Sequence, residues 1–448
     1  MADASALRIA VIGAGWAGCA AAVELADQGH NVTLLEASRT LGGRARKVEQ
    51  HGRTLDNGQH ILLGAYAESL RLMRKVGVDL EKSLLRLPLQ MCYPPASGGM
   101  HFVAPTLPAP LHLLWALLTS TGLNREDKMS LARFSTTARW MGWQMYQDCS
   151  VSELLQRFDQ TERLCRLMWA PLCIAALNTP PERASAQVFL NVLRDSLGAK
   201  RAASDMLLPR TDLTALFPQH AADFVAQRGG QVKTGIAVRK IRKTGTNWEL
   251  ECGAGETPDV QLFDRIIIAT GADRAAKLLA TLEGADTPPA LPSFGYEPIT
   301  TCYLQYAPEI TLPRAFFALL DQPELGHWGQ FVFDRGQLNP EQAGLLAVVV
   351  SASGNAIELD NGALAAAIAA QLAQALGLPE LAAPLWQQVI SEKRATFSCS
   401  PGLARPGNET SIPGLLLAGD YTAGDYPATL EAAVRSGVLA AGKAALFT

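Results

Sequence analysis

The glycine-rich turn at residues 13–18, with the sequence GAGWAG, constrains the fold of this chain more than any other segment. It follows the apolar run 7–12, which predicts a buried strand, and it opens the stretch 17–29, which predicts a helix closed by a glycine. A second apolar run, 31–37, predicts another strand. Strand, turn, helix and strand in this order predict an α/β unit in which a helix joins two parallel strands.

Each glycine of this turn has its own steric role in such a unit. Gly13 allows the tight turn, Gly15 lets the backbone approach a pyrophosphate on the helix N-terminus, and Gly18 permits close packing of helix on strand. Ala14 and Ala17 lie between them and are expected to contact the same ligand. The turn therefore predicts a dinucleotide site and not only a place where a helix packs closely.

Glu36 ends the second predicted strand. A carboxylate there accepts hydrogen bonds from both hydroxyls of an adenosine ribose. Because strand, helix, second strand and acidic terminus agree, the segment predicts a Rossmann-type nucleotide-binding domain. It does not distinguish NAD from FAD.

Length and composition limit the remaining possibilities. At about 150 residues per domain, 448 residues predict two or three structural units. The formal net charge is -3 without any block of like charges, so neither nucleic acid nor an acidic membrane surface is an expected partner. Charged residues make up 18% of the chain, against about 25% in ordinary soluble domains, which suits apolar ligands. Eight scattered cysteines indicate thiols in a reducing cytosol and predict no metal site.

No targeting or membrane-spanning segment is expected. The N-terminus lacks a cationic region, and no run approaches the roughly 18 apolar residues of a spanning helix. The segment LHLLWALL at 111–118 is the longest candidate, and it follows three prolines. It is expected to rest on a membrane, to line an apolar tunnel or to be a core helix, and the same alternatives hold for 164–177. The predicted location is cytoplasmic, with peripheral contact at the inner face of the membrane left open.

The segment that follows the second strand identifies the cofactor. Gly42 and Gly43 expose adjacent backbone N–H groups as an anion-binding concavity, and Arg44 adds a fixed positive charge. This segment resembles the Gly-Gly-Arg turn of the flavin-dependent amine oxidase and phytoene desaturase superfamily, whose arginine reaches the FAD phosphates or the flavin edge. The resemblance implies FAD.

The C-terminal region matches the same superfamily. A predicted strand at 413–420 ends in Gly419 and Asp420, which the resemblance places at the ribityl chain. A predicted helix at 429–447 would point its N-terminus, with Thr429 and Leu430 in the first turn, at the flavin pyrimidine ring. Free N–H donors and the helix dipole stabilise the negative charge of a reduced flavin there. An ordinary docking helix is the alternative.

Two middle segments complete the expected cofactor domain. The segment 229–241 resembles the strand that covers the adenine, with Val238 as the contact, and 264–272 predicts a buried strand. The expected class is α/β, with a Rossmann-type FAD-binding domain and a discontinuous substrate domain of mixed sheet plus helices. The FAD-binding domain is predicted at 1–80, 225–290 and 390–448, and the substrate domain at 81–224 and 291–389.

The polar sequence DNGQH precedes an apolar run, and the resemblance places it where the chain passes the isoalloxazine ring. Asp56 and Asn57 are expected to brace the loop, and Gly58 to admit close backbone approach to the ring. Gln59 and His60 are expected to approach the reacting face. His60 is the candidate proton donor, and a structural histidine is the alternative.

Longer strings at 56–66, 169–189, 392–397 and 418–437 are similar to the hydroxysqualene dehydroxylase family, squalene-associated FAD enzymes of bacterial hopanoid synthesis. The resemblance runs the full length and implies reductive removal of a hydroxyl from a C30 isoprenoid.

Such chemistry needs a proton donor in an apolar site, for which Asp56 and Lys393 are alternatives to His60. The lysine-bearing substrate strand of amine oxidases has no match, which disfavours an amine substrate. A carotenoid or phytoene-type desaturase is one alternative function. The other is a non-catalytic flavoprotein that carries a polyprenyl lipid, which the presence of Glu36, Arg44 and Asp420 disfavours. The oligomeric state is not predicted.

Overall fold

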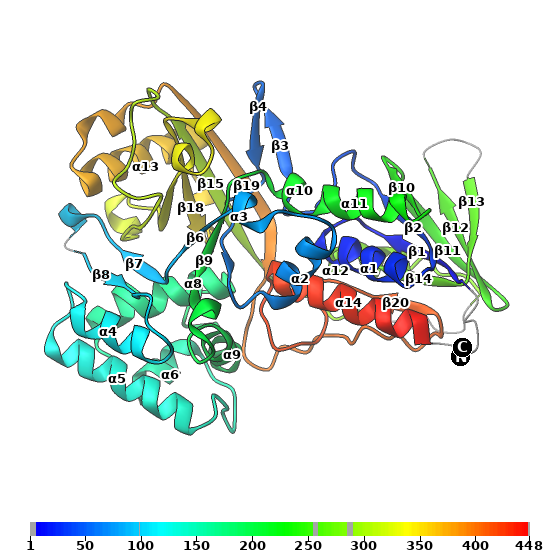
Figure 1. Cartoon of the computed structure of the whole chain (residues 1–448), viewed down its shortest axis with the longest axis horizontal. Helices are drawn as coiled ribbons and strands as arrows, with labels where there is room; N and C mark the ends of the chain where they lie inside the picture. Colours follow the sequence, from blue (N-terminus) through cyan, green and yellow to red (C-terminus); the bar gives the residue numbers. More distant parts are fainter. Residues whose placement is uncertain (1–5, 98, 254–258, 285–289, 447–448) are drawn as a thin grey trace.

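The computed structural model describes residues 6–97, 99–253, 259–284 and 290–446. Figure 1 shows two halves: a nucleotide-type half with its sheet and helices on the right, and a second half on the left. In the left half a sheet covered by α13 (Asn361–Leu376) lies above a group of helices. The predicted class, an α/β fold with a Rossmann-type part and a second part of strands and helices, is confirmed.

The nucleotide half is built on a five-stranded parallel sheet in the order β10-β2-β1-β14-β20. The strands β1, β14 and β20 are almost continuously apolar, as expected in a parallel sheet covered on both faces, whereas the edge strand β10 has the polar sequence QVKT. The strands are β1 (Arg8–Ile12), β2 (Asn31–Glu36), β10 (Gln231–Thr234), β14 (Arg265–Ile268) and β20 (Leu415–Leu417). The predicted strands at 7–12, 31–37, 264–272 and 413–420 are confirmed.

Two helices from opposite ends of the chain pack side by side against this sheet. They are α1 (Trp16–Asp27) and α14 (Leu430–Leu446), and a Cβ built on Gly437 of α14 would lie 2.1 Å from the carbonyl oxygen of Ala17. Only glycine permits this approach. Residue 447, the last of the predicted C-terminal helix, lies outside the described residues.

The predicted domain boundary at 225 stays a prediction, and the structure shows which element lies at this position. It falls inside α11 (Pro218–Gln227), whose buried Ala221, Ala222 and Val225 pack in the same apolar cluster as α1. An amphipathic helix stays with the surface that buries its apolar face. The segment from α10 (Leu213–Leu216) onward therefore belongs to the nucleotide half.

The single strand predicted at 229–241 is also wrong, because the chain forms β10 and β11 (Val238–Thr244) in two different sheets. Gly235, with φ +73°, breaks the strand in the left-handed region that favours glycine. The three strands β11, β12 (Asn247–Cys252) and β13 (Asp259–Phe263) make a separate antiparallel sheet.

The sheet of the second half has the order β16-β17-β18-β15-β19, and all its pairs are antiparallel where a mixed sheet was expected. The strands β16, β17 and β18 are consecutive neighbours, and their connections suit antiparallel pairs, whereas β15 pairs with β18 and is separated from β16 in the sheet by two strands. The strands are β15 (Tyr296–Gln305), β16 (Phe316–Ala318), β17 (Phe331–Asp334), β18 (Leu345–Ser351) and β19 (Trp386–Phe397). In Figure 1 β19 runs from this sheet to the nucleotide half.

The helices predicted within 81–224 gather below this sheet. They are α4 (Leu111–Thr119), α5 (Arg125–Trp140), α6 (Val151–Arg157), α8 (Ala170–Leu177) and α9 (Ala186–Ser196). Leu164, Leu167, Trp169, Cys173 and Leu177 are buried, so the apolar segment 164–177 is core. Across the described ranges, no helix has the length and apolar composition needed to cross a membrane.

Shorter elements connect the two halves. The strands β5, β9 and β6 form an antiparallel sheet that joins the region after the DNGQH loop to the second half, and β3 and β4 form a hairpin. These and the remaining elements are β3 (Lys47–Gln50), β4 (Arg53–Asp56), β5 (Leu62–Leu63), α2 (Ala67–Lys75), α3 (Leu80–Ser83), β6 (Leu84–Leu87), β7 (Gln90–Cys92), β8 (His101–Val103), α7 (Glu162–Leu164), β9 (Met206–Pro209) and α12 (Ala272–Leu279).

Candidate active site

The turn between β1 and α1 has no room for side chains at its first and last glycine. A Cβ built on Gly13 would lie 2.8 Å from the Ala269 oxygen, and one on Gly18 would lie 1.8 Å from the Gly13 oxygen. Gly13 also has φ +105°, and its N–H donates to the Leu35 carbonyl at 2.7 Å. The turn is thus fixed in the tight form that brings the N-terminus of α1 to the edge of the sheet.

The second glycine pair lies against this turn. The N–H of Gly42 donates to the Ala14 carbonyl at 2.8 Å, and a Cβ on Gly43 would lie 3.1 Å from the Cα of Gly15. A Cβ on Gly15 would meet only the Cα of Gly43, at 3.9 Å, so the space beside Gly15 is open. The two glycine segments form one concavity of backbone at the helix N-terminus, which suits an anionic group.

Glu36 is held at the rim of this concavity. Its carboxylate oxygens accept hydrogen bonds from the N–H of Ala14 at 2.7 Å and of Ser38 at 2.8 Å. Each oxygen keeps a lone pair for a further donor. Ile236 donates its N–H to the Glu36 carbonyl at 2.9 Å, which brings the start of β11, with Val238, to the same place.

Arg44 and Asp420, 376 positions apart, meet in an ion pair. Nη2 of Arg44 donates to Oδ1 of Asp420 at 2.7 Å, and Nη1 donates to the Ala395 carbonyl of β19 at 2.6 Å. Burial lowers the pKa of Arg44, but the charge and hydrogen bond of Asp420, together with the charge of Glu392, raise it above its usual value. The guanidinium therefore stays charged where three distant segments converge.

Tyr421 is a site residue that the sequence did not predict. A Cβ on Gly419 would lie 2.5 Å from the Tyr421 ring, so the glycine makes room for this side chain. The ring is 2% exposed and lies 6.1 Å from that of Phe294, and its hydroxyl has no hydrogen-bond partner among the described residues. A buried unpaired hydroxyl is costly, so this one indicates a ligand as partner. A tyrosine directly after Gly-Asp was the available signal.

Thr429 caps the N-terminus of α14 and precedes the helix, where the sequence predicted it in the first turn. The hydroxyl of Thr429 accepts the N–H of Ala432 at 3.1 Å, and Leu430 begins the helix. This helix start comes ten residues after Asp420.

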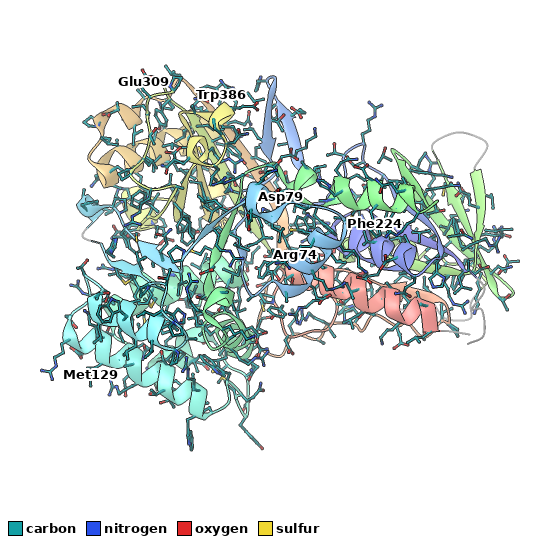
Figure 2. The ribbon with its side chains drawn as sticks, viewed as in Figure 1. Arg74, Asp79, Met129, Phe224, Glu309 and Trp386 are labelled. Carbon is teal, nitrogen blue, oxygen red and sulfur yellow. The ribbon has the colours of Figure 1, made fainter. Side chains whose placement is uncertain are left out.

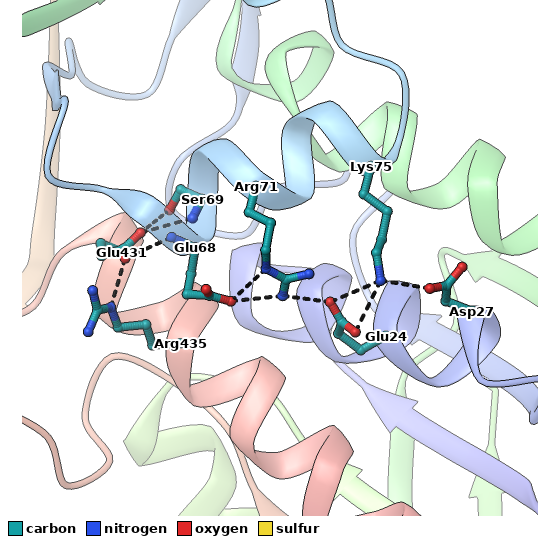
Figure 3. Close-up of polar contacts among 8 residues, drawn as sticks. All are labelled: Glu24, Asp27, Glu68, Ser69, Arg71, Lys75, Glu431 and Arg435. Carbon is teal, nitrogen blue, oxygen red and sulfur yellow. Dashed lines mark hydrogen bonds and ion pairs between the residues drawn. The ribbon is translucent and has the colours of Figure 1, made fainter. Parts of the chain in front are cut away.

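Glu431, in the first turn of α14, also caps a second helix, and sequence reasoning missed this role. Its fully buried carboxylate accepts the N–H of Glu68 at 3.1 Å and the N–H and hydroxyl of Ser69 at 2.9 and 2.7 Å, and it pairs with Arg435 at 2.7 Å. Figure 3 shows that these contacts bring the start of α2 to the start of α14. No local pattern marks such a partner, because the two segments lie over 360 positions apart.

Further along α2, two cations hold it to α1 (Figure 3). Arg71 and Lys75 contact the carboxylate of Glu24 at 2.7 and 3.3 Å, and Lys75 also reaches Asp27 at 2.7 Å. The helices α1, α2 and α14 are therefore held together, and the N-terminus of α1 lies at the glycine concavity.

The DNGQH loop is braced as predicted. Oδ1 of Asp56 accepts the N–H of Leu213 at 2.8 Å, and its carbonyl accepts the Tyr303 hydroxyl at 2.9 Å. The Asn57 amide donates to the Arg44 carbonyl at 3.0 Å and to Glu392 at 3.2 Å. The loop is thus tied directly to the arginine of the Gly-Gly-Arg turn.

The next three residues differ in how the protein uses them. A Cβ on Gly58 would meet nothing closer than 3.8 Å, so the protein itself leaves space there. Gln59 is buried, and its Oε1 accepts Nη1 of Arg335 at 3.1 Å, which engages this amide within the protein. Nδ1 of His60 lies 2.7 Å from the Gly58 carbonyl. Because a carbonyl only accepts, Nδ1 carries the proton and Nε2 is the nitrogen left for a ligand.

The surroundings of His60 favour its neutral imidazole. Burial lowers its pKa, the Gly58 hydrogen bond opposes this, and the nearby Arg44 charge lowers it further. A proton donated from Nε2 therefore has to be loaded at a pH below the usual histidine range.

The two alternative donors lie in different surroundings. Lys393 is exposed on β19. Asp56 is buried beside a polar cavity of about 460 Å³ that Arg53, Tyr303 and Arg335 also line, and burial raises its pKa to about 7. Exposure counts against the lysine as a donor in an apolar site.

The raised pKa of Asp56 predicts how its replacement affects stability. Below about pH 4 the carboxyl is protonated in both the folded and the unfolded state, and above pH 7 the folded protein must hold it ionised. Wild-type stability is therefore lost as pH rises from about 4 to 7, by on the order of 2–4 kcal/mol. Asp56→Asn keeps an acceptor for Leu213. In urea unfolding, its free energy of unfolding relative to that of the wild type should be higher at pH 8 than at pH 5. A difference that does not change with pH would contradict this.

Comparisons with known proteins decide which family this site belongs to. The model of the flavin-containing amine oxidoreductases matches residues 16–445. The chain belongs to this family. It is accordingly an FAD-dependent oxidoreductase, and the predicted cofactor is confirmed.

Individual relatives align with nearly the whole length of this chain. It is 30% identical to hydroxysqualene dehydroxylase of Rhodopseudomonas palustris over 97% of this chain and 99% of that protein. It is 26% identical to a 15-cis-phytoene desaturase of an Oncidium hybrid, over 97% of this chain and 77% of that protein. The solved structure of a putative protoporphyrinogen oxidase from Exiguobacterium superposes with a TM-score of 0.69 at 17% identity, over 99% of both chains, which shows the shared fold. The predicted resemblance to hydroxysqualene dehydroxylases is confirmed.

The residues present fit FAD. The all-glycine concavity has open space beside Gly15 for a pyrophosphate, and Glu36 has free lone pairs for ribose hydroxyls. Arg44 supplies a charge, and the unpaired Tyr421 hydroxyl offers a donor.

Loss of the Glu36 carboxylate should weaken FAD binding. Glu36→Ala removes charge-assisted hydrogen bonds of about 1.5–3 kcal/mol in total, which is roughly a 10- to 150-fold weaker affinity in a titration of the apoprotein. Glu36→Gln, which keeps one acceptor oxygen, should lose less. An alanine variant with unchanged affinity would remove the ribose assignment.

Proposed function

We propose that this enzyme removes the hydroxyl group of hydroxysqualene reductively and gives squalene and water. The observation that supports this most is the similarity over 97%, 97% and 96% of the chain to three relatives named hydroxysqualene dehydroxylase. The three dehydroxylases are 30%, 27% and 25% identical, and phytoene and zeta-carotene desaturases, at 26% identity or less, rank below all three as matches. The desaturase alternative is therefore not favoured.

The reaction breaks an allylic C–O bond, adds hydride to the carbon and a proton to the oxygen. Reduced FAD, when bound, supplies the hydride. The protein has to position the alcohol, exclude water and deliver the proton.

Apolar side chains near the C-terminal end of β19 suit the exclusion of water. The rings of Phe294, Phe397 and Tyr421 are buried in one cluster, with Phe294 within 6.1 Å of each of the other two. The transfer of an isoprenoid chain from lipid to these apolar surroundings would cost little free energy.

His60 is our proposed proton donor. Nδ1 is held by the Gly58 carbonyl, which fixes the ring and leaves Nε2 to face the leaving hydroxyl. Protonation at Nε2 loads the donor, and its transfer releases water. We also propose that the backbone at Gly58 and Gln59 passes the flavin next to His60.

The substrate class also bears on location. A C30 isoprenoid partitions into bilayers, so an enzyme without a described spanning helix has to collect it at a membrane surface. We propose a cytoplasmic protein with peripheral contact at the inner face of the membrane.

Product analysis tests the proposed function. Purified protein, FAD, a chemical reductant and hydroxysqualene are incubated without oxygen, and the extract is analysed by mass spectrometry. Squalene is the expected product, and a boiled-protein sample is the control. Recovery of unchanged hydroxysqualene would refute the proposal, and a product with an added double bond would favour the desaturase.

A further inference from the structure

Large apolar side chains are exposed mainly in one part of the chain. Eight of the fifteen such residues in the described ranges fall within 107–146. They are Leu107, Leu111, Leu114, Trp115, Leu118, Met129, Trp140 and Tyr146. Figure 2 places Met129 at the outer edge of the helical part of the second half. Apolar exposure gathered on one region marks an interaction site more often than scattered leucines do.

The centre of this region is one face of α4. Leu111, Leu114, Trp115 and Leu118 follow the spacing i, i+3, i+4 and i+7, so they line one side of the helix, and we call them the apolar ridge. Their exposed fractions are 50%, 51%, 54% and 62%. The opposite side of α4, with Ala116 and Leu117, is buried. The helix is thus apolar on both sides, although only one side has a partner within the described chain.

Unpaired cations lie on the neighbouring helix. Lys128 of α5 donates to the carbonyls of Leu118 and Ser120 at 2.9 and 2.8 Å, which holds α5 against the end of α4. Arg125, Arg133 and Arg139 of α5 are exposed and form no ion pair with any residue that the structure describes. Against these three arginines, the exposed acid on α5 is Glu126.

We propose that the apolar ridge and the α5 arginines form a docking surface for a lipid bilayer that carries anionic headgroups. The proposal rests on the proposed function, since a bilayer is where a C30 isoprenoid is found. Leucines around a tryptophan suit the boundary between headgroups and acyl chains. The arginines complement anionic lipid, and each cation near such a surface contributes roughly fivefold in affinity.

Charge also argues for lipid over a second copy of this chain. Two copies that meet through the ridge would bring their α5 arginines together, and like charges oppose such contact. Without a described helix able to cross the bilayer, the ridge would rest in the interface plane.

Flotation of the full-length holoprotein with vesicles tests the surface. Vesicles of phosphatidylcholine alone and vesicles with added phosphatidylglycerol are compared. The double variant Leu114→Glu, Trp115→Glu changes exposed positions only, and it should lower binding to both by at least roughly tenfold. Leu385→Glu, at a leucine that is 76% exposed outside the region, is the matched control and should float like the wild type.

A second variant separates the two parts of the surface. Arg125→Glu with Arg133→Glu should abolish the gain from phosphatidylglycerol and its sensitivity to salt, while binding to phosphatidylcholine is kept. Flotation does not depend on turnover, so activity in detergent reports separately on the proposed function. Unchanged flotation of the ridge variant would overturn the proposal. So would a wild type that does not float but forms dimers that the ridge variant loses.

Discussion

His60→Phe is expected to lower the turnover of hydroxysqualene by roughly 10²- to 10⁴-fold, the usual contribution of a positioned general acid. FAD should stay bound with a nearly unchanged spectrum, because the hydrogen bond of the His60 ring in the described structure goes to the Gly58 carbonyl and not to the glycine concavity. Turnover and FAD content of the same preparation are measured together.

His60→Gln is the matched control for shape. It keeps hydrogen bonding without proton donation, so it should be nearly as slow as the phenylalanine variant. The lowered pKa of His60 also predicts that wild-type turnover falls as pH rises through a value below 6.5, because the donor is lost. The glutamine variant should lose this pH dependence. Near-normal turnover of that variant would assign the proton to another group, with Asp56 the first to test.

Glu431→Ala is expected to lower the free energy of unfolding by about 3 kcal/mol. It leaves the first N–H groups of α2 without their cap and deprives Arg435 of its partner. Because the Arg435 side chain is 39% exposed, water compensates part of the lost ion pair. Urea unfolding of the holoprotein measures the difference.

Glu431→Gln separates the cap from the charge. It keeps a side-chain oxygen for the N–H groups of α2 and loses only the charge, so a smaller loss of about 1 kcal/mol is expected. Equal losses in both variants would show that the charge, and not the cap, stabilises the meeting of α2 and α14.

Local sequence patterns were sufficient to predict the two glycine turns that form the backbone concavity. The turn at 13–18, Glu36 and the Gly-Gly-Arg segment all lie within the first 44 residues, and the hydrogen bond from Ala14 to Glu36 joins residues 22 positions apart. Sequence spacing registers such constraints directly. Local patterns also predicted the parallel strands β1, β14 and β20, whose apolar runs are continuous.

Contacts between segments far apart in the chain could not be predicted from the sequence. Arg44 and Asp420 were each predicted as cofactor residues, but their ion pair depends on how the two ends of the chain meet. The burial of Tyr421 and the second cap made by Glu431 have the same origin.

Exposure was likewise unpredictable for the two most apolar helical segments. Composition alone could not show that 164–177 is core while α4 presents its ridge outward. A net charge of -3 also gave no reason to expect a membrane surface with anionic lipid. Folding nevertheless gathers three unpaired arginines on α5 within the described structure.

The direction of electron flow tests the central claim most directly. The enzyme with chemically reduced FAD is mixed with hydroxysqualene in an anaerobic stopped-flow instrument, and the absorbance of oxidised flavin is followed. We expect the absorbance to return, with one squalene formed per flavin. Reduced enzyme that stays reduced with hydroxysqualene, while oxidised enzyme is bleached by a polyprenyl hydrocarbon, would contradict reductive dehydroxylation and assign the enzyme to desaturation.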